Sequence, residues 1–252
     1  MDIITVDQLV KVYNGFKGTK EVTAVDHLHL SIQKGDFVGI MGPSGSGKTT
    51  LLNILSGVDT ATSGEVIIDG KDIVQMKKDQ LALFRRGNIG YIFQDFNLLD
   101  SLTLKENIAL PLILDKVEPK KINMKVQQLM TFLGIEELKD KYPYHLSGGQ
   151  KQRVAAARAI VNNPSVIFAD EPTGNLDSKS ANNLMNTIAK LNEELHSTVL
   201  MVTHDAFAAS FCKRIIFIKD GKIELEIHSS GDRKQFFDKI LESQSIIGGG
   251  QS

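Results

Sequence analysis

The segment 42–49, Gly-Pro-Ser-Gly-Ser-Gly-Lys-Thr, constrains the fold more than any other feature of this sequence. It matches the pattern G-x-x-x-x-G-K-[ST] in full, between a short apolar run (37–41) and a stretch (48–56) that we expect to be helical. Glycine allows the backbone to wrap closely round a phosphate, while the N–H groups that begin the helix attract its charge. A strand, such a loop and a helix in this order predict a phosphate-binding loop, or P-loop, in an α/β domain.

Two residues of this loop carry the expected chemistry. Lys48 can reach the β- and γ-phosphates of a nucleoside triphosphate, and the hydroxyl of Thr49 can hold Mg²⁺. The alternative is an ordinary glycine-rich turn, which would not require this spacing or the strand and helix on either side. The sequence therefore favours a nucleotide site with a magnesium ion.

Short apolar runs alternate with helical spacing through most of the chain, which is typical of a mainly parallel sheet covered by helices. Between 97 and 145 helical spacing replaces the strand pattern, with Pro111 and Pro119 as breaks, so a helical subdomain is expected there. The first 41 residues are expected to form strands, as an N-terminal antiparallel β region. Further strands are expected at 65–68, 89–93, 165–169, 198–202, 214–219 and 222–227, and helices at 151–161, 178–195, from 205 onward and at 232–244.

Four polar residues directly follow predicted strands. Asp170 and Glu171 come after 165–169, Gln94 after 89–93, and His204 shortly after 198–202. Because the carboxyl ends of parallel strands meet at one edge of a sheet, these side chains are expected beside the P-loop. There Asp170 can hold the Mg²⁺ shell, and Glu171 can orient a water molecule and take its proton. By position alone, Gln94 and His204 could equally be structural hydrogen-bonding residues.

A second helix start is unusually rich in glycine. The segment 146–150 reads Leu-Ser-Gly-Gly-Gln and precedes the predicted helix 151–161. Ser147 and Gln150 have the spacing of a capping box, in which each side chain bonds to the other's backbone N–H. Two glycines beside the cap leave the helix N-terminus bare, which also suits an anion. Both interpretations remain open from the residues alone.

Together, segments 42–49 and 146–150 resemble the P-loop and signature of ATP-binding cassette (ABC) ATPases, and the resemblance covers nearly the whole chain. In that family two cassettes pair head to tail, and each ATP lies between the P-loop of one copy and the signature of the other. The resemblance implies an active ATPase with ATP and Mg²⁺ as cofactors and a second copy of the chain as a partner. Asn175 departs from the family pattern, where many members have Ala.

The resemblance also implies a role for individual residues. Tyr13 would stack on adenine, although an aromatic residue near a strand end can equally belong to the core. The implied catalytic residues are Glu171, His204, Gln94 and Lys48, and the implied magnesium ligands are Thr49, Gln94 and Asp170. The implied ATP contacts are Tyr13, Gly42, Pro43, Ser44, Gly45, Ser46, Gly47, Lys48, Thr49, Thr50, Gln94, Ser147, Gly148, Gly149, Gln150, Asp177 and His204.

Narrower likenesses point to a branch of the family. The segment 170–177 resembles the cassettes of lipoprotein release, macrolide export and cell division. Segments 93–100, 105–108 and 232–237 resemble the bacitracin and lantibiotic resistance transporters of Gram-positive bacteria. In that group the cassette serves a large permease with an extracellular domain, often together with a sensor histidine kinase. Alternatives that stay open are a lipoprotein-release or other export cassette and a non-transporting ATPase that controls cell-wall hydrolysis.

Composition excludes several other classes. The chain has 252 residues, 42% of them hydrophobic and 23% charged, which disfavours disorder. Its 29 basic and 30 acidic residues nearly balance, so no nucleic-acid partner is expected. A single cysteine, Cys212, excludes a disulfide scaffold. No apolar run is long enough to cross a bilayer, so we expect a cytoplasmic protein, held at the inner face of the membrane through a permease.

The expected organisation is one ATPase domain over 1–228, with a helical subdomain at about 97–160 inserted in its P-loop core, and a helical tail over 229–252. Two apolar groups have open interpretations. Phe96, Leu98 and Leu99 either seal the helical subdomain onto the core or form a groove for a permease helix. The stripe on the last helix either packs on the chain itself, which is favoured, or meets a partner; it consists of Phe236, Phe237, Ile240 and Leu241.

Overall fold

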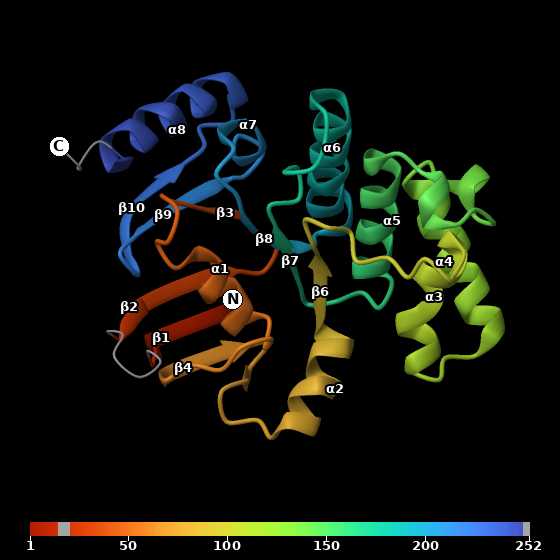
Figure 1. Ribbon diagram of the computed structural model, residues 1–252, viewed down its shortest axis with the longest axis horizontal. Helices are drawn as coiled ribbons and strands as arrows, with labels where there is room; N and C mark the ends of the chain where they lie inside the picture. Colours follow the sequence, from red (N-terminus) through yellow and green to blue (C-terminus); the bar gives the residue numbers. More distant parts are fainter. Residues whose placement is uncertain (15–20, 249–252) are drawn as a thin grey trace.

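The computed structural model describes residues 1–14 and 21–248, which form two sheets and eight α-helices (Figure 1). The first sheet is antiparallel, and its strand order is β2 (Val22–Gln33), β1 (Asp2–Tyr13), β4 (Ser63–Ile68) and β5 (Lys71–Asp72). The second sheet has the order β10 (Lys222–His228), β9 (Arg214–Lys219), β3 (Phe37–Met41), β8 (Thr198–Val202), β7 (Val166–Asp170) and β6 (Ile89–Ile92). Its strands are parallel except β10, which pairs with β9 as an antiparallel hairpin. The expected fold class is therefore confirmed.

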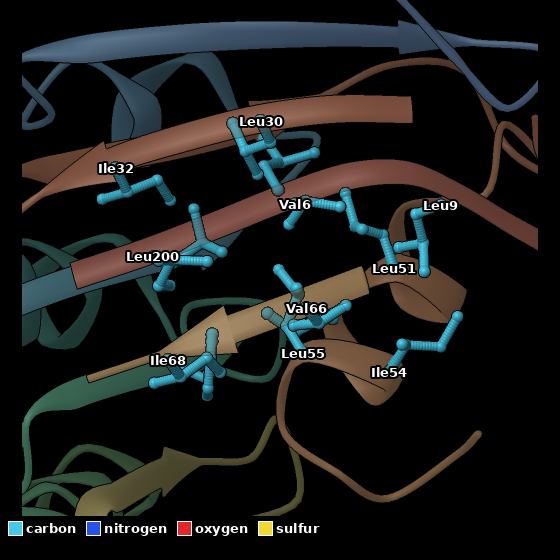
Figure 2. Close-up of a cluster of buried hydrophobic side chains, with 14 of the residues drawn as sticks. Val6, Leu9, Leu30, Ile32, Leu51, Ile54, Leu55, Val66, Ile68 and Leu200 are labelled. Atoms are coloured by element: carbon cyan, nitrogen blue, oxygen red, sulfur yellow. The ribbon is translucent and has the colours of Figure 1, made fainter. Parts of the chain in front are cut away.

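Successive side chains of the central strands point to opposite faces of the second sheet, so the core is divided into two layers. In β8, Leu200 and Val202 face the layer that contains α1 (Lys48–Leu55) and the antiparallel sheet. Val199 and Met201 face the opposite layer, with the helices that follow β7 and β8. Every residue of β8 is buried, as expected for a parallel strand covered on both sides. Figure 2 shows the first layer, where side chains of β1, β2, β4 and α1 meet Leu200.

A separate helical cluster lies beside the second sheet (Figure 1). It contains α3 (Leu104–Leu114), α4 (Pro119–Phe132) and part of α5 (Gly148–Ile160), with short 3-10 turns at Glu136–Leu138 and Pro143–His145. Pro119 begins α4, as the sequence indicates. The expectation that Pro111 breaks the helix is wrong, because Pro111 lies inside α3. Burial of the neighbouring Leu112 compensates for the backbone hydrogen bond that proline cannot make.

Other expectations need correction at helix boundaries. The chain forms α2 (Lys78–Asn88), which the periodicity does not predict because Phe84 is its only buried residue. The terminal helix α8 (Arg233–Gly248) is longer than expected, so Gly248 belongs to it, and at this end of the chain 249–252 fall outside the described residues. The remaining helices are α6 (Ser178–Leu195) and α7 (Ala206–Ala209). Leu195, the last residue of α6, is 51% exposed.

The apolar stripe of α8 packs mainly on the chain itself. Phe236 and Ile240 are buried in the same cluster as strands β3, β8 and β9, and Phe237 packs against that cluster. Leu241 is 43% exposed and does not follow this pattern. The helix lies along the outer side of α7 and the β9–β10 hairpin (Figure 1). The tail therefore extends the hydrophobic core of the domain.

Candidate nucleotide-binding and hydrolysis site

Four adjacent parallel strands, β3, β8, β7 and β6, end at one edge of the second sheet. The P-loop follows β3, and His204 follows β8 after one residue. Asp170 ends β7 with Glu171 directly after it, and Gln94 follows β6 after one residue. Strand order thus brings together segments more than 150 residues apart in sequence, at the edge where ligands bind in open α/β sheets.

The shape of the P-loop depends on glycine. Gly47 has a φ of 99°, in the left-handed region, and a Cβ atom there would overlap the carbonyl group of Ala24. Lys48 begins α1 and donates from Nζ to the carbonyl oxygen of Pro43 at 2.8 Å, so its side chain spans the loop. Ser46 is buried beneath it. The structure thus has a glycine-dependent loop between β3 and α1, with a lysine across it at the start of the helix.

Charges at this edge influence each other. Partial burial lowers the pKa of Lys48, and the negative charges of Glu171 and then Asp170 oppose that shift. Burial raises the pKa of Asp170, and Glu171 raises it further, while Lys48 lowers it. One ammonium and two carboxylates thus share a partly desolvated space, where their interactions are stronger than in bulk water. Additional positive charge at this position would stabilise both carboxylates in their ionised form.

Glu171 is held from two sides. Its backbone has a φ of 43°, unusual for a residue other than glycine, and its N–H donates to the carbonyl of Val202 at 2.9 Å. The backbone N–H of His204 donates to Oε2 at 3.3 Å, and the Nδ1 atom of His204 lies 2.9 Å from Oε1. The Glu171 side chain is only 18% exposed, whereas that of His204 is 74% exposed. The histidine thus orients the carboxylate and still presents its ring to solvent.

Gln94 lies beside the loop that follows Glu171. A Cβ atom built on Gly174 would approach Gln94 Nε2 to 2.8 Å, so only glycine fits there without displacing the glutamine. Asn175 donates from Nδ2 to the carbonyl of Gln94 at 3.3 Å and to Asp95 Oδ1 at 2.8 Å. The residue that departs from the resembled pattern thus ties the two loops together.

Ser147 and Gln150 form the capping box that the sequence indicates. Ser147 Oγ accepts from the N–H of Gln150 at 3.3 Å, and Gln150 Oε1 accepts from the N–H of Ser147 at 3.0 Å. The helix α5 begins at Gly148, three residues earlier than expected. A Cβ atom on Gly149 would lie 2.7 Å from Ser180 Oγ, so this glycine permits close packing of α5 on α6. Within the described part of the chain, hydrogen bonds do not connect this segment to the P-loop of the same chain.

Asp177 and Tyr13 also have local partners. Asp177 caps α6 by accepting from the N–H groups of Lys179 and Ser180 at 3.0 Å. A hydrogen bond from the Ser180 hydroxyl contributes most to lowering the pKa of Asp177.

Tyr13 is 42% exposed, so it is not a core residue. Its hydroxyl donates to Asp59 at 2.8 Å and lies 3.5 Å from Thr50 Oγ1. Tyr13 therefore lies beside the first turn of the helix that follows the P-loop.

Gln152 is a site-supporting residue that the sequence analysis did not identify. It is fully buried in α5 and donates from Nε2 to the carbonyl oxygens of Phe93 at 3.1 Å and Pro172 at 3.0 Å. These two residues directly precede Gln94 and follow Glu171, so one amide group links both functional loops. Helical spacing contained the signal, because Gln152 precedes the buried Ala155 and Ala156 by three and four residues.

A P-loop, two carboxylates, a histidine and a glutamine at neighbouring strand ends define a P-loop nucleotide-hydrolysing protein. The family model described as ABC transporter matches residues 25–174. The chain belongs to the ABC transporter family, as its ATPase component.

Individual relatives agree with this assignment. The chain is 49% identical to the bacitracin export ATP-binding protein BceA of Halalkalibacterium halodurans, over 100% of this chain and 99% of that protein. It is 44% identical to the macrolide export ATP-binding/permease protein MacB of Syntrophobacter fumaroxidans, over 93% of this chain and 33% of MacB. Among solved structures it is similar to the dimeric post-hydrolysis state of the cassette MJ0796 bound to ADP and Pi. That similarity has a TM-score of 0.81 and 42% identity, over 91% of this chain and 100% of the other.

Proposed function

We propose that this chain is the ATP-hydrolysing subunit of a membrane exporter that confers resistance to antimicrobial peptides of the bacitracin or lantibiotic type. The observation that carries the proposal is the end-to-end similarity to the bacitracin export protein, which includes the terminal helix as well as the ATPase core. Segments 93–100, 105–108 and 232–237, which resemble that group, fall within this alignment. Among the described residues, no helix is both long and apolar enough to span a bilayer. The proposal therefore assigns passage through the membrane to a separate permease, with this chain at its cytoplasmic face.

The proposed chemistry is phosphoryl transfer from ATP to water. Lys48 and the P-loop backbone, from Gly42 to Thr50, hold the β- and γ-phosphates. Glu171 takes the proton of the attacking water, and His204, which contacts the Glu171 carboxylate, keeps that base in position. The partial burial that shifts the pKa values of Lys48 and Asp170 supports this role, since groups with shifted pKa values concentrate at active sites.

Magnesium fits the donor set at this edge. Thr49 offers a hydroxyl oxygen, Asp170 a carboxylate and Gln94 an amide oxygen, which are the hard donors that Mg²⁺ prefers. These few protein ligands would be enough, because phosphate oxygens and water would supply the rest. Burial and the Glu171 charge raise the pKa of Asp170, and a bound cation would oppose both effects. When bound, Mg²⁺ would neutralise charge that develops on the phosphates.

We further propose that two copies pair head to tail, with Ser147 to Gln150 of each copy facing the ATP of the other. Three features support this arrangement: the glycine-rich start of α5, its lack of bonds to its own P-loop among the described residues, and the dimeric structure of MJ0796. Asp177 lies at the start of the neighbouring helix α6 and is exposed. Tyr13, also exposed, is proposed to stack on adenine.

The permease is proposed to dock in a groove between the core and the helical cluster. This groove has a volume of about 550 Å³ and is lined by α2, β6, α3 and α5, including Tyr91, Phe93, Leu110 and Leu114. A short cytoplasmic helix of the permease is the proposed occupant, because the groove adjoins Gln94 and would link permease movement to the ATP site. Leu99 is exposed and does not line this groove, whereas Leu98 packs on the helical cluster. A sensor histidine kinase would join through the permease.

We also propose boundaries for the ATPase domain, its helical subdomain and the tail. We assign residues 1–228 to the ATPase domain, with a helical subdomain at about 97–160, and 229–252 to the tail. The separate apolar cluster of α3, α4 and α5 supports the subdomain. Because Phe236 and Ile240 are buried in the domain's own core, the tail is expected to fold together with it.

The test is to express this chain with its permease in a bacitracin-susceptible Gram-positive host and measure the minimal inhibitory concentration of bacitracin. The pair should raise that concentration, and bacitracin should stimulate ATP hydrolysis by the purified complex. Replacing Glu171→Gln should abolish both effects while ATP still binds, because only the base is lost. Protection against macrolides but not peptides would transfer the proposal to macrolide export. A chain that copurifies with no membrane protein would contradict it.

A further inference from the structure

The loop that carries His204 has a contact on each side. On one side, the backbone N–H and the ring of His204 contact the carboxylate of Glu171, as described above. The carbonyl oxygen of His204 accepts a hydrogen bond of 3.1 Å from Nε2 of Gln244, a residue of the terminal helix forty positions further along the chain. From these contacts we propose that α8 positions His204 for ATP hydrolysis and that Gln244 is the positioning residue. This inference rests on the roles proposed for His204 and Glu171.

A second set of contacts holds α8 against α7 and against Phe211, which lies just beyond that helix. The guanidinium carbon of Arg233 lies 4.3 Å from the centre of the Phe211 ring and 5.9 Å from that of Phe207. Between these aromatic contacts and Gln244, the side chains of Phe236 and Ile240 are buried in the cluster that contains Ala206 and Ala209. The first turn of α8 therefore contacts α7 and Phe211 through Arg233. Further along α8, Gln244 contacts the loop that precedes α7.

The connection between β8 and α7 is too short to absorb a displacement. Only Thr203, His204 and Asp205 lie between Val202 and Ala206. Thr203 is fully buried, and its N–H donates to the carbonyl of Ile40 at 3.1 Å. Asp205 caps α7 by accepting from the N–H of Phe207 at 2.9 Å. The peptide group between His204 and Asp205 is held at both ends, because its N–H donates to Thr203 Oγ1 at 3.1 Å and its carbonyl oxygen accepts from Gln244. Loss of the contact with Gln244 would free the carbonyl end and change the distance from His204 to Glu171.

The proposed effect of the Gln244–His204 hydrogen bond is on the rate of hydrolysis and not on the stability of the fold. Gln244 is only half-buried, and the carbonyl of His204 can bind water when the amide is absent. Loss of this hydrogen bond should therefore change folding stability little. It should instead change how often His204 and Glu171 adopt the geometry for hydrolysis, and hence kcat. No P-loop residue contacts Gln244 among the hydrogen bonds of the described chain, so ATP binding should be unaffected.

The experiment uses the full chain in complex with its permease. Gln244→Glu keeps the shape of the side chain but removes its N–H donors and places a negative charge beside a carbonyl oxygen. Its matched control is Gln235→Glu, the same change at an exposed position in the first turn of the same helix. Gln244→Lys restores a donor. ATP hydrolysis would be measured over a range of ATP concentrations, together with Tm.

Gln244→Glu should lower kcat by about two- to tenfold, the effect of one hydrogen bond, with KM changed by less than about twofold. Gln244→Lys should recover most of the lost rate, and Gln235→Glu should resemble the unchanged protein. A kcat equal to that of the control would overturn the inference. So would a lower kcat accompanied by an equal loss in Gln235→Glu.

Failure of the proposed function gives a different result. In that case Glu171→Gln and His204→Ala would retain normal hydrolysis, and the inference would fall with the roles on which it rests. If those two variants lose activity while Gln244→Glu does not, only the role of the terminal helix is refuted.

Discussion

Asp170 shows how a functional residue can oppose folding. Its carboxylate lies at the end of a buried strand, where burial and the neighbouring Glu171 raise its pKa and Lys48 only partly compensates. A carboxylate with a raised pKa is less easily ionised in the folded chain than in the unfolded chain. Above the unfolded pKa, about 3.9, ionisation therefore lowers the free energy of unfolding. A cation bound at the proposed magnesium site would offset this cost, because it would stabilise the ionised carboxylate.

Asp170→Asn should consequently raise Tm while it abolishes ATP hydrolysis. At pH 7, without nucleotide and with EDTA present, the expected rise is about 1–4 °C for a chain of this size. The gain should shrink as pH falls through the raised pKa of Asp170 and should disappear below about pH 3, where the carboxyl group is neutral in both the folded and the unfolded chain. The measurement is thermal denaturation at several pH values, with Asp140→Asn, at an exposed carboxylate, as control. A lower Tm at pH 7 would contradict the explanation.

At the scale of elements, single buried amide side chains join segments that regular hydrogen bonding leaves apart. Asn107, in α3, is fully buried and makes four hydrogen bonds. Its Oδ1 accepts from the N–H of Leu99, and its Nδ2 donates to the carbonyl oxygens of Leu99, Leu102 and Thr103. The loop after Gln94 is thereby attached to the start of α3. Gln152 does the same for the loops that contain Gln94 and Glu171.

Replacement of Asn107 by Ala should destabilise the chain by roughly 2–4 kcal/mol, because several backbone groups lose a partner in a buried place. The expected fall in Tm is about 4–12 °C. Asn123→Ala, at an exposed position on the neighbouring helix α4, should change Tm by less than about 2 °C and serves as control. Equal effects of the two substitutions would show that the buried hydrogen bonds are not important for stability.

At the scale of the whole molecule, the hydrogen bonds of the described residues do not join the two halves of the proposed nucleotide site within one chain. The P-loop, Asp170, Glu171 and His204 form one half, whereas Ser147 to Gln150 cap a helix of the other subdomain. A head-to-tail pair related by two-fold symmetry would complete two sites at once. In such a pair, each ATP would depend on residues from both copies.

Mixing two inactive variants tests this arrangement. Lys48→Ala and Ser147→Arg should each be inactive in a complex with the permease, because both sites of each dimer contain a lesion. In a mixed dimer one site carries both lesions and the other carries none. Equal amounts should therefore recover about a quarter of normal ATPase activity if the two sites act independently.

Two controls make that measurement decisive. Subunit exchange must be verified by tagging the two variants differently. A covalently linked dimer with one lesion-free site must hydrolyse ATP, since strict coupling between the sites would otherwise hide the recovery. With both conditions met, absence of recovery would show that Ser147 does not serve the ATP of a second copy.

Much of the candidate site was determined by the sequence alone, because its elements obey local rules. Short apolar runs such as 198–202 and the loop from Gly42 to Thr49 predicted buried parallel strands that end at one edge, with Glu171 and His204 just beyond two of them. The capping box of Ser147 was also predicted, since it involves residues three positions apart. These features depend on neighbours within a few residues or on the shared direction of parallel strands.

Other features were decided only by tertiary structure. Pro111 remains inside α3 because buried packing outweighs one missing backbone hydrogen bond, and α8 continues to Gly248 because the core of the domain receives its apolar face. The link from Gln244 to His204 joins residues forty positions apart, and Gln152 bridges two loops that meet only after the sheet has formed. Helical spacing can indicate that a residue such as Gln152 is buried, but it does not indicate the partner, because the partner of each polar group is selected by the arrangement of distant segments in space.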